Sequence, residues 1–167
     1  KENLKKATMI VISSAIKNNN KELRAAKKKN LPIFKRGEML ANIVSLKKNI
    51  VIAGSHGKTT TTSLVANILL SANLDPTVIN GGVINSFKNT AKLGQGEWAV
   101  IESDESDGSF LQLPVTYSII TNLDKEHLDF YGSYKGLENS FCSFIKKTPT
   151  FGKSIICLDD KNLKKLL

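Results

Sequence analysis

Continuous apolar runs alternate with helical patterns along most of this chain. Leucine, valine and isoleucine recur at helical spacing over 59–71, and leucine and phenylalanine do so over 134–146. Between and around these helices, apolar runs predict strands at 50–53, 77–80, 97–103, 117–123 and 154–160. Strands that are apolar throughout are typical of a parallel sheet with both faces covered, so we expect an α/β fold with a mostly parallel sheet and helices on both faces.

The first 48 residues repeat the same alternation on a smaller scale. Apolar runs at 7–13 and 31–34 predict two short strands. Polar, lysine-rich residues at 18–30 predict a solvated helix. A second helix is expected over 36–46, with Met39, Leu40, Ile43 and Val44 on one face.

Charge is distributed unevenly over the 167 residues, whose net charge is +9. Residues 1–48 hold 13 Lys and Arg against 3 Asp and Glu, a balance of +10, whereas residues 49–167 hold 11 against 12, a balance of −1. The excess is nearly all lysine without interleaved aromatic residues, which favours a solvated helix face over a nucleic-acid interface. Because the strand and helix pattern and the charge balance both change near residue 48, we predict a first domain over 1–47 and a second over 48–167.

The segment VIAGSHGKTTTTSL joins a predicted strand to a predicted helix through two glycines. Such a turn aims unpaired backbone N–H groups and the positive end of the helix dipole at one point. Lys58 adds a charge there and Thr59 a hydroxyl, so the segment predicts a phosphate-binding loop in which Lys58 meets phosphate and not a protein carboxylate. The standard pattern G-x-x-x-x-G-K-[ST] would place its first glycine at Ile52, so the loop is shortened. A tight turn with a surface lysine is the alternative.

Acidic residues follow the next two apolar strands. Glu102 ends the run 97–103, and the run 117–123 leads into NLDKEHLD. Because Mg²⁺ is usually held by one or two carboxylates together with phosphate oxygens, Thr59 and Glu102 predict a magnesium–nucleotide site. The segment SDESDG does not fit a calcium loop, because Pro114 stands where a bidentate glutamate is required. A solvated loop with a turn at Asp107-Gly108 remains possible for that segment.

Two histidines and two cysteines complete the candidate chemistry. His127 lies in a polar cluster with Asp124, Glu126 and Asp129, which favours contact with a metal or phosphate over a surface ion pair. His56 lies inside the phosphate loop and is expected to shape it. Cys142 and Cys157 have neither CxxC nor zinc spacing, and we expect free, buried thiols in a reducing compartment. No apolar run approaches the roughly 20 residues that a membrane span needs, and no signal-peptide pattern is found at the start of the given sequence.

Three segments together resemble the central ATPase domain of the Mur ligases: GSHGKTTTTSLVANILLSANLDPTVINGG, ESDESDGSFLQLP and TNLDKEHLDFYG. That family has a shortened loop, G-[TS]-x-G-K-[TS], which accounts for Ile52. The upstream segment MIVISSAIKNNNKELRAAKKKNLPIFKRGEMLA is similar to the end of the first, Rossmann-like domain, which binds the UDP-linked substrate. SHGKTTTT together with ESDESDGSF points to the family member that adds alanine.

The resemblance implies a bacterial, cytoplasmic enzyme of cell-wall (peptidoglycan) precursor synthesis, with ATP and Mg²⁺ as cofactors. It would join L-alanine to UDP-N-acetylmuramate through an acyl phosphate. Lys58, Glu102 and His127 are implied as catalytic residues and Thr59, Glu102 and His127 as metal ligands. The nucleotide would be bound by Gly54, Ser55, His56, Gly57, Lys58, Thr59 and Thr60. The muramyl substrate would be bound by Asn80, Asp104, Glu105, Ser106 and Ser109.

Family members have three domains, and this chain opens at Lys1 without the glycine-rich uridine-diphosphate loop. We therefore expect a piece of a longer protein that is inactive alone, with no nucleic-acid or membrane partner. Alternatives are another Mur-type or folylpolyglutamate-type amide ligase, a stand-alone P-loop NTPase module, or a basic nucleic-acid-binding ATPase. The last would require basic residues near the site, where this sequence has carboxylates.

Overall fold

The computed structural model describes residues 2–166 and is built around a six-stranded sheet with strand order β5-β4-β6-β3-β7-β8. All neighbouring strands are parallel except β5, which pairs antiparallel with β4. The predicted α/β fold with a mostly parallel sheet is therefore confirmed. The strands are β3 (Lys48–Ala53), β4 (Thr77–Ile84), β5 (Asn89–Lys92), β6 (Trp98–Glu102), β7 (Tyr117–Ile120) and β8 (Lys153–Ile156).

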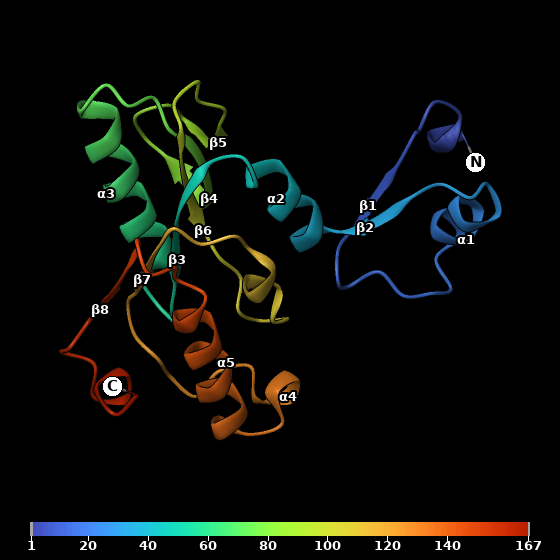
Figure 1. Cartoon of the computed structure of the whole chain (residues 1–167). Helices are drawn as coiled ribbons and strands as arrows, with labels where there is room; N and C mark the ends of the chain where they lie inside the picture. Colours follow the sequence, from blue (N-terminus) through green and yellow to red (C-terminus); the bar gives the residue numbers. More distant parts are fainter. Residues whose placement is uncertain (1, 167) are drawn as a thin grey trace.

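Helices cover both faces of this sheet (Figure 1). Helix α3 (Lys58–Ser71) lies on one face. The other face carries α2 (Arg36–Val44), the 3₁₀ helix η2 (Ser109–Gln112) and α5 (Tyr134–Lys146), whose buried side chains join one core cluster. Two further short helices, α4 (Leu128–Tyr131) and α6 (Lys161–Lys164), are too short for helical periodicity to predict.

Strand β3 is covered on both faces, which explains why residues 50–53 are all apolar. Val51 and Ala53 belong to the core cluster under α2 and α5, whereas Ile52 points to the opposite face, and all three are fully buried. Because successive side chains of a strand point to opposite faces, a central strand covered on both sides needs apolar residues at every position. Phe110 of η2 fills the larger core, with its ring centroid 5.3 Å from that of Phe141.

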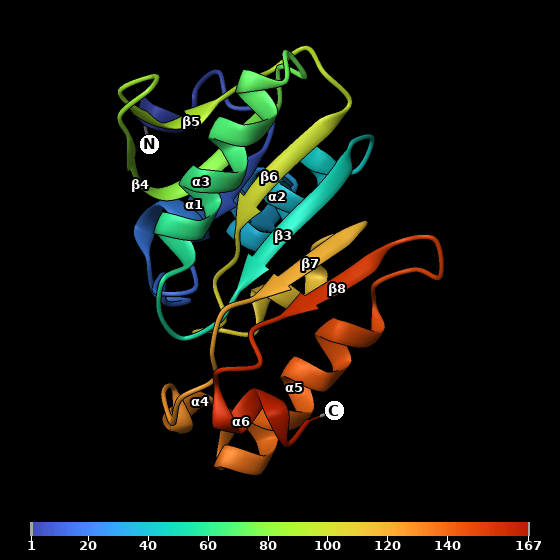
Figure 2. The same cartoon turned by 90° about the vertical axis from the view of Figure 1, so that its left-hand side faces the viewer.

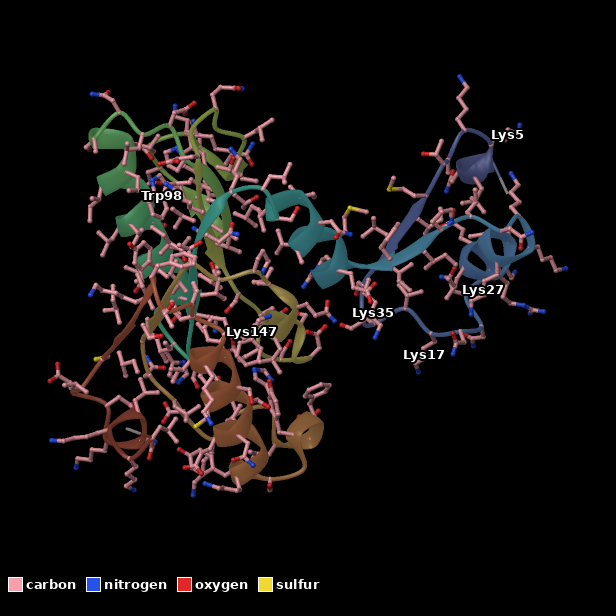
Figure 3. All side chains as sticks on the ribbon, viewed as in Figure 1. Lys5, Lys17, Lys27, Lys35, Trp98 and Lys147 are labelled. Atoms are coloured by element: carbon pink, nitrogen blue, oxygen red, sulfur yellow. The ribbon has the colours of Figure 1, made fainter. Side chains whose placement is uncertain are left out.

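Residues before α2 form a small lobe beside the main sheet (Figure 1). It contains η1 (Glu2–Leu4), the parallel strands β1 (Ile10–Ile12) and β2 (Ile33–Lys35), and α1 (Lys21–Lys28). Asn20 caps α1, because its side-chain oxygen accepts hydrogen bonds from the first turn. Lys5, Lys17 and Lys27 all lie on this lobe, well apart from the phosphate loop (Figure 3).

Helix α2 contributes to the core of the main sheet and also contacts β1 and β2 of this lobe. Val44 is fully buried in the larger core, whereas the side chain of Ile43 is 59% exposed. The predicted common face of α2 is therefore wrong at Ile43, because adjacent helical residues are turned by about 100° and only one of them faces the sheet. The division into domains at residue 47 stays a prediction.

Strands β3, β6, β7 and β8 point in one direction and end at the same edge of the sheet (Figure 2). Residue 52 of β3 pairs with Glu102 of β6, so the phosphate loop begins beside the acidic strand end. Ligands of open α/β sheets bind at this carboxyl edge. None of the described helices is long and apolar enough to cross a membrane.

Candidate phosphate and metal site

The loop between β3 and α3 needs its two glycines. Gly54 has φ of +138°, and a Cβ there would lie 2.1 Å from the hydroxyl oxygen of Thr121. Gly57 has φ of +77° and is the N-cap of α3. L-residues with side chains rarely adopt these angles. The loop thus turns into α3 with the first-turn N–H groups, including that of Thr60, free of helical partners.

The end of β7 holds this loop in shape. The backbone N–H of His56 donates to Asn122 Oδ1 at 2.7 Å, and Asn122 Nδ2 donates to the carbonyl of His56 at 2.9 Å. The hydroxyl of Thr121 donates to the same carbonyl at 2.7 Å, and Ser55 Oγ accepts from the N–H of Asp124 at 2.8 Å. Asn122 and Thr121 were not among the residues predicted from the sequence. Their position at the carboxyl end of a neighbouring strand is the signal that could have found them.

Lys58 folds back over the loop and is not free. Its Nζ lies 2.6 Å from the carbonyl oxygen of Gly54, 3.1 Å from that of Ser55 and 2.8 Å from Glu105 Oε1. The prediction that its charge does not meet a protein carboxylate is therefore wrong. The partner lies 47 positions later in the chain, and only the fold brings it to the loop.

Glu105 is a buried carboxylate, with 4% of the residue exposed. Burial raises the pKa of its carboxyl group, although the hydrogen bond from Lys58 acts in the opposite direction. No described residue donates a hydrogen bond to Glu105 Oε2, which is also buried. The hydroxyl of Tyr131 donates to the backbone carbonyl of Glu105 and fixes this part of the chain. Burial, followed by the nearby charge of Glu105, raises the pKa of Tyr131 as well.

Thr59 and Glu102 lie together at the edge where α3 begins and β6 ends. Thr59 Oγ1 donates to Glu102 Oε1 at 2.9 Å, and Glu102 Oε2 accepts from the N–H of Gly81 at 2.5 Å. Neighbouring ligands of an octahedral Mg²⁺ at about 2.0–2.1 Å from the ion lie roughly 2.9 Å apart. The two oxygens share a hydrogen bond and are also close enough to be ligands of one Mg²⁺.

The two histidines have different nearest carboxylates, although Glu126 lies close to both. His56 Nε2 lies 3.1 Å from Asp124 Oδ2 and 3.7 Å from Glu126 Oε1. His127 Nε2 lies 3.9 Å from Glu105 Oε1. Ligand atoms of Glu105, Glu126 and His127 all lie within 4.8 Å of one another, a grouping of the described residues that does not include Glu102. The structure thus places the three predicted metal ligands in two groups, Thr59 with Glu102 and His127 with Glu105.

A cavity of about 590 Å³ opens between α2 and the carboxyl ends of β4 and β6. Lys58 and Glu102 reach its wall, so it adjoins the phosphate loop. Of the predicted substrate residues, Asn80, Asp104 and Ser109 line it. Further lining side chains include Val11, Arg36, Met39, Leu40, Ile43 and Phe110.

The polar side chains on the cavity wall differ in whether each of their hydrogen-bonding atoms has a partner. Asn80 Nδ2 donates to Ser63 Oγ and to the carbonyl of Gly82, but Asn80 Oδ1 is buried without a described donor. Asp104 accepts from Arg36 Nη2 at 3.1 Å and from the hydroxyl of Ser106 at 2.5 Å. Ser106 supports Asp104 and does not line the cavity.

The cysteines lie outside this site. Both are free thiols, but Cys142 is half-buried and Cys157 is exposed, so the expected burial is wrong for both. Cys157 directly follows edge strand β8, whose outer side pairs with no described strand.

Family models match both parts of the chain. The Mur ligase middle domain matches residues 52–167. The model described as Mur ligase family, catalytic domain matches residues 1–48.

Curated relatives match over the whole chain. The UDP-N-acetylmuramate–L-alanine ligase of Pelagibacter ubique is 66% identical over 167 residues, which are 100% of this chain and 36% of that protein. The ligase of the same name from Parvibaculum lavamentivorans is 51% identical over 166 residues, which are 99% of this chain and 34% of that protein. The chain thus spans about a third of the length of these relatives.

Solved structures share the fold. The UDP-N-acetylmuramate–alanine ligase MurC of Thermotoga maritima superimposes with a TM-score of 0.89 at 28% identity, over 99% of this chain and 38% of that one. The MurF ligase of the same organism, solved in complex with ADP, has a TM-score of 0.59 at 20% identity, over 95% of this chain and 39% of that one. The middle-domain model alone covers more than half of the sequence, and the chain belongs to the Mur ligase family.

Proposed function

We propose that this chain is the nucleotide- and muramate-binding part of an ATP-dependent ligase that joins L-alanine to UDP-N-acetylmuramate during peptidoglycan precursor synthesis. The observation that carries the proposal is that Lys58 and Glu102 stand both at the phosphate loop and on the wall of the 590 Å³ cavity. One arrangement can therefore bring a phosphate and a second substrate to the same point. The names of the relatives supply the identity of that substrate.

The nucleotide is assigned to the loop from Gly54 to Thr60. The glycines and the start of α3 direct backbone N–H groups and the positive helix end towards bound phosphates. Lys58 neutralises the charge of the β- and γ-phosphates. Asn122 shapes the loop through two hydrogen bonds with the backbone of His56.

Mg²⁺ is assigned to Thr59 and Glu102 because of the spacing of their oxygens. His127 is assigned to a second cation near the reacting carboxylate. When bound, a divalent cation neutralises charge that builds up on the transferred phosphoryl group. Gly81 orients Glu102 through its backbone N–H.

The muramyl group is assigned to the cavity under α2. Asn80 Oδ1 is a buried acceptor that a hydroxyl or amide of the sugar can satisfy. Asp104 and Ser109 offer further polar contacts at the same wall, and Ser106 orients Asp104. The substrate's carboxylate then faces Lys58 and Glu102 at the mouth of the loop.

The proposed reaction activates that carboxylate. A carboxylate oxygen attacks the γ-phosphorus of ATP, the bond to the bridging oxygen breaks, and ADP leaves. The amine of L-alanine then attacks the acyl carbon, and phosphate leaves with the former carboxylate oxygen while the nitrogen loses a proton. The residues of this chain contribute by positioning and by neutralising charge, which are the main sources of rate in phosphoryl transfer.

A product assay on the full-length protein tests this proposal. With Mg²⁺-ATP, UDP-N-acetylmuramate and L-alanine, we expect equal amounts of ADP, phosphate and UDP-N-acetylmuramoyl-L-alanine. Leaving out either substrate should abolish ADP release. ADP release that ignores both substrates would instead indicate a stand-alone NTPase, and use of another amino acid would indicate another amide ligase. A cytoplasmic location stays a prediction.

A further inference from the structure

The ion pair between Lys58 and Glu105 occupies the position where the loop lysine is needed for phosphate. Only 16% of the Lys58 side chain and 5% of the Glu105 side chain are exposed, and the two charged atoms lie 2.8 Å apart. Two loop carbonyls also accept from Lys58 Nζ. Glu105 therefore offers Lys58 a negative partner of the kind that a bound phosphate would offer.

One lysine cannot neutralise both a nucleotide and Glu105. When Lys58 turns to phosphate, the buried carboxylate of Glu105 is left without its cation. A buried charge without a partner is strongly unfavourable, and a second negative group beside it makes the cost larger. Nucleotide binding therefore favours either a new partner for Glu105 or protonation of its carboxylate.

The surroundings of Glu105 fit a divalent cation as that partner. Its second oxygen, Oε2, is buried and without a described donor. His127 and Glu126 bring one nitrogen and one carboxylate oxygen to within 4.8 Å of its ligand oxygen. The imidazole of His127 lies 3.9 Å from Oε1, the oxygen that also accepts from Lys58, so the carboxylate that Lys58 would release already stands beside an imidazole and a second carboxylate. These side chains form a donor set that a divalent cation such as Mn²⁺ or Mg²⁺ accepts.

The backbone at this point is held in place, so a change of partner needs only side-chain movement. Tyr131 donates to the carbonyl of Glu105, and the N–H of Gly108 donates to the same carbonyl at 3.2 Å. Lys58 keeps two carbonyl acceptors on the loop while its third contact changes.

We propose that Glu105 is an exchange residue, which holds Lys58 in the absence of nucleotide and binds a divalent cation beside His127 once Lys58 contacts phosphate. The inference rests on the proposed nucleotide site and adds a coupling to it. Because such a coupling is reciprocal, the cation strengthens nucleotide binding and the nucleotide strengthens cation binding.

Nucleotide affinity, measured without and with Mg²⁺, tests this exchange. A non-hydrolysable ATP analogue is titrated calorimetrically into the full-length protein, first in EDTA and then in saturating Mg²⁺. In EDTA, Glu105→Gln should bind the analogue at least about fivefold more tightly than the unmodified protein, the lower end of typical coupling effects. In Mg²⁺ this advantage should disappear, because the variant has lost a cation ligand.

Asp107→Asn is the matched control for removing a negative charge. Asp107 lies two positions after Glu105, but its Oδ1 accepts from the N–H of Ser109 and does not contact Lys58. We expect the affinity of this variant for the ATP analogue to stay within about twofold of that of the unmodified protein in both buffers. The lost charge acts on the nucleotide only through solvent, where salt screens it. Glu105→Asp, which keeps the charge but shortens the reach to Lys58, should also bind more tightly in EDTA and provides the test if the glutamine variant does not fold.

The outcomes separate the two proposals. Equal changes in Glu105→Gln and Asp107→Asn, or weaker binding by both Glu105 variants in EDTA, would overturn the exchange and leave the nucleotide site standing. An unmodified protein that does not bind the analogue in either buffer would overturn the proposed function itself.

Discussion

The hydroxyl of Thr59 and the carboxylate of Glu102 lie 2.9 Å apart, although the two residues are 43 positions apart in the chain. Their contact joins the first turn of α3 to the end of β6. Parallel pairing of β3 with β6 brings about this contact, because it places both strand ends at one edge.

Glu102→Gln should weaken Mg²⁺-dependent ligation far more than it weakens the fold. The amide keeps the shape of the side chain but removes the charge that faces the metal, so we expect about a hundredfold lower kcat/KM, roughly 2.7 kcal/mol in barrier. Glu97→Gln, which removes an exposed partner of Lys48 before β6, is the control. Activity of Glu102→Gln within about threefold of the unmodified protein at saturating Mg²⁺, roughly 0.6 kcal/mol, would show that the metal assignment is wrong.

Gly81→Ala should raise the Mg²⁺ concentration needed for activity. A Cβ at this position would lie 2.8 Å from Glu102 Oε1 and 2.9 Å from Oε2, so the carboxylate must move. Titration of activity against Mg²⁺ should show a half-saturation point shifted upwards by about tenfold. Changes to groups that orient metal ligands lower metal affinity by amounts of this order. Val83→Ala in the same strand, where the side chain is 64% exposed, should leave the titration unchanged. Identical curves for the two variants would contradict the role given to Gly81.

Lys58→Ala should abolish ATP turnover and should also lower stability. Loss of the lysine leaves the buried Glu105 carboxylate unpaired, which costs about 3 kcal/mol in the free energy of unfolding. The double variant Lys58→Ala, Glu105→Gln should recover much of that loss, because no buried charge remains. Denaturant unfolding at neutral pH measures both effects. A double variant no more stable than Lys58→Ala would mean that the ion pair is not buried in solution.

Asn122→Ala should loosen the phosphate loop. The change removes both hydrogen bonds to the backbone of His56, so we expect about 1 kcal/mol less stability and nucleotide binding weakened by about fivefold through lost preorganisation. Asn162→Ala removes a comparable bond, at 2.8 Å to the carbonyl of Leu123, but does not contact the loop. Equal loss of nucleotide affinity in the two variants would contradict the proposal that Asn122 holds the phosphate loop in shape.

Sequence patterns predicted the elements whose signal is local. Helix α5 begins at Tyr134 and ends at Lys146, as the spacing of its apolar residues indicates. Strand β5 was missed because NTAK has one apolar residue and lies at a sheet edge, where burial does not select the composition. The strand predicted over 77–80 continues through Gly81 and Gly82 to Ile84, since glycines do not carry a strand signal.

The site was predictable only in part, for a related reason. The loop residues and Glu102 are marked by their position at strand ends, and that rule is topological. The contact between Lys58 and Glu105 depends on how the segment after β6 folds back over the loop, and no spacing in the chain encodes it. Asn122 carries no motif of its own, because its role is to bond the backbone of another segment.

Transfer of labelled oxygen from the substrate to phosphate tests most directly whether the site activates the muramyl carboxylate. UDP-N-acetylmuramate with ¹⁸O in both carboxylate oxygens is turned over by the full-length protein with Mg²⁺-ATP and L-alanine, and the released phosphate is analysed by mass. Carboxylate activation predicts one ¹⁸O atom in each phosphate and one in the new amide, with no labelled phosphate when UDP-N-acetylmuramate carries ¹⁶O. Phosphate without label, released at the same rate without L-alanine, would mean that the site hydrolyses ATP with water and does not activate the muramyl carboxylate.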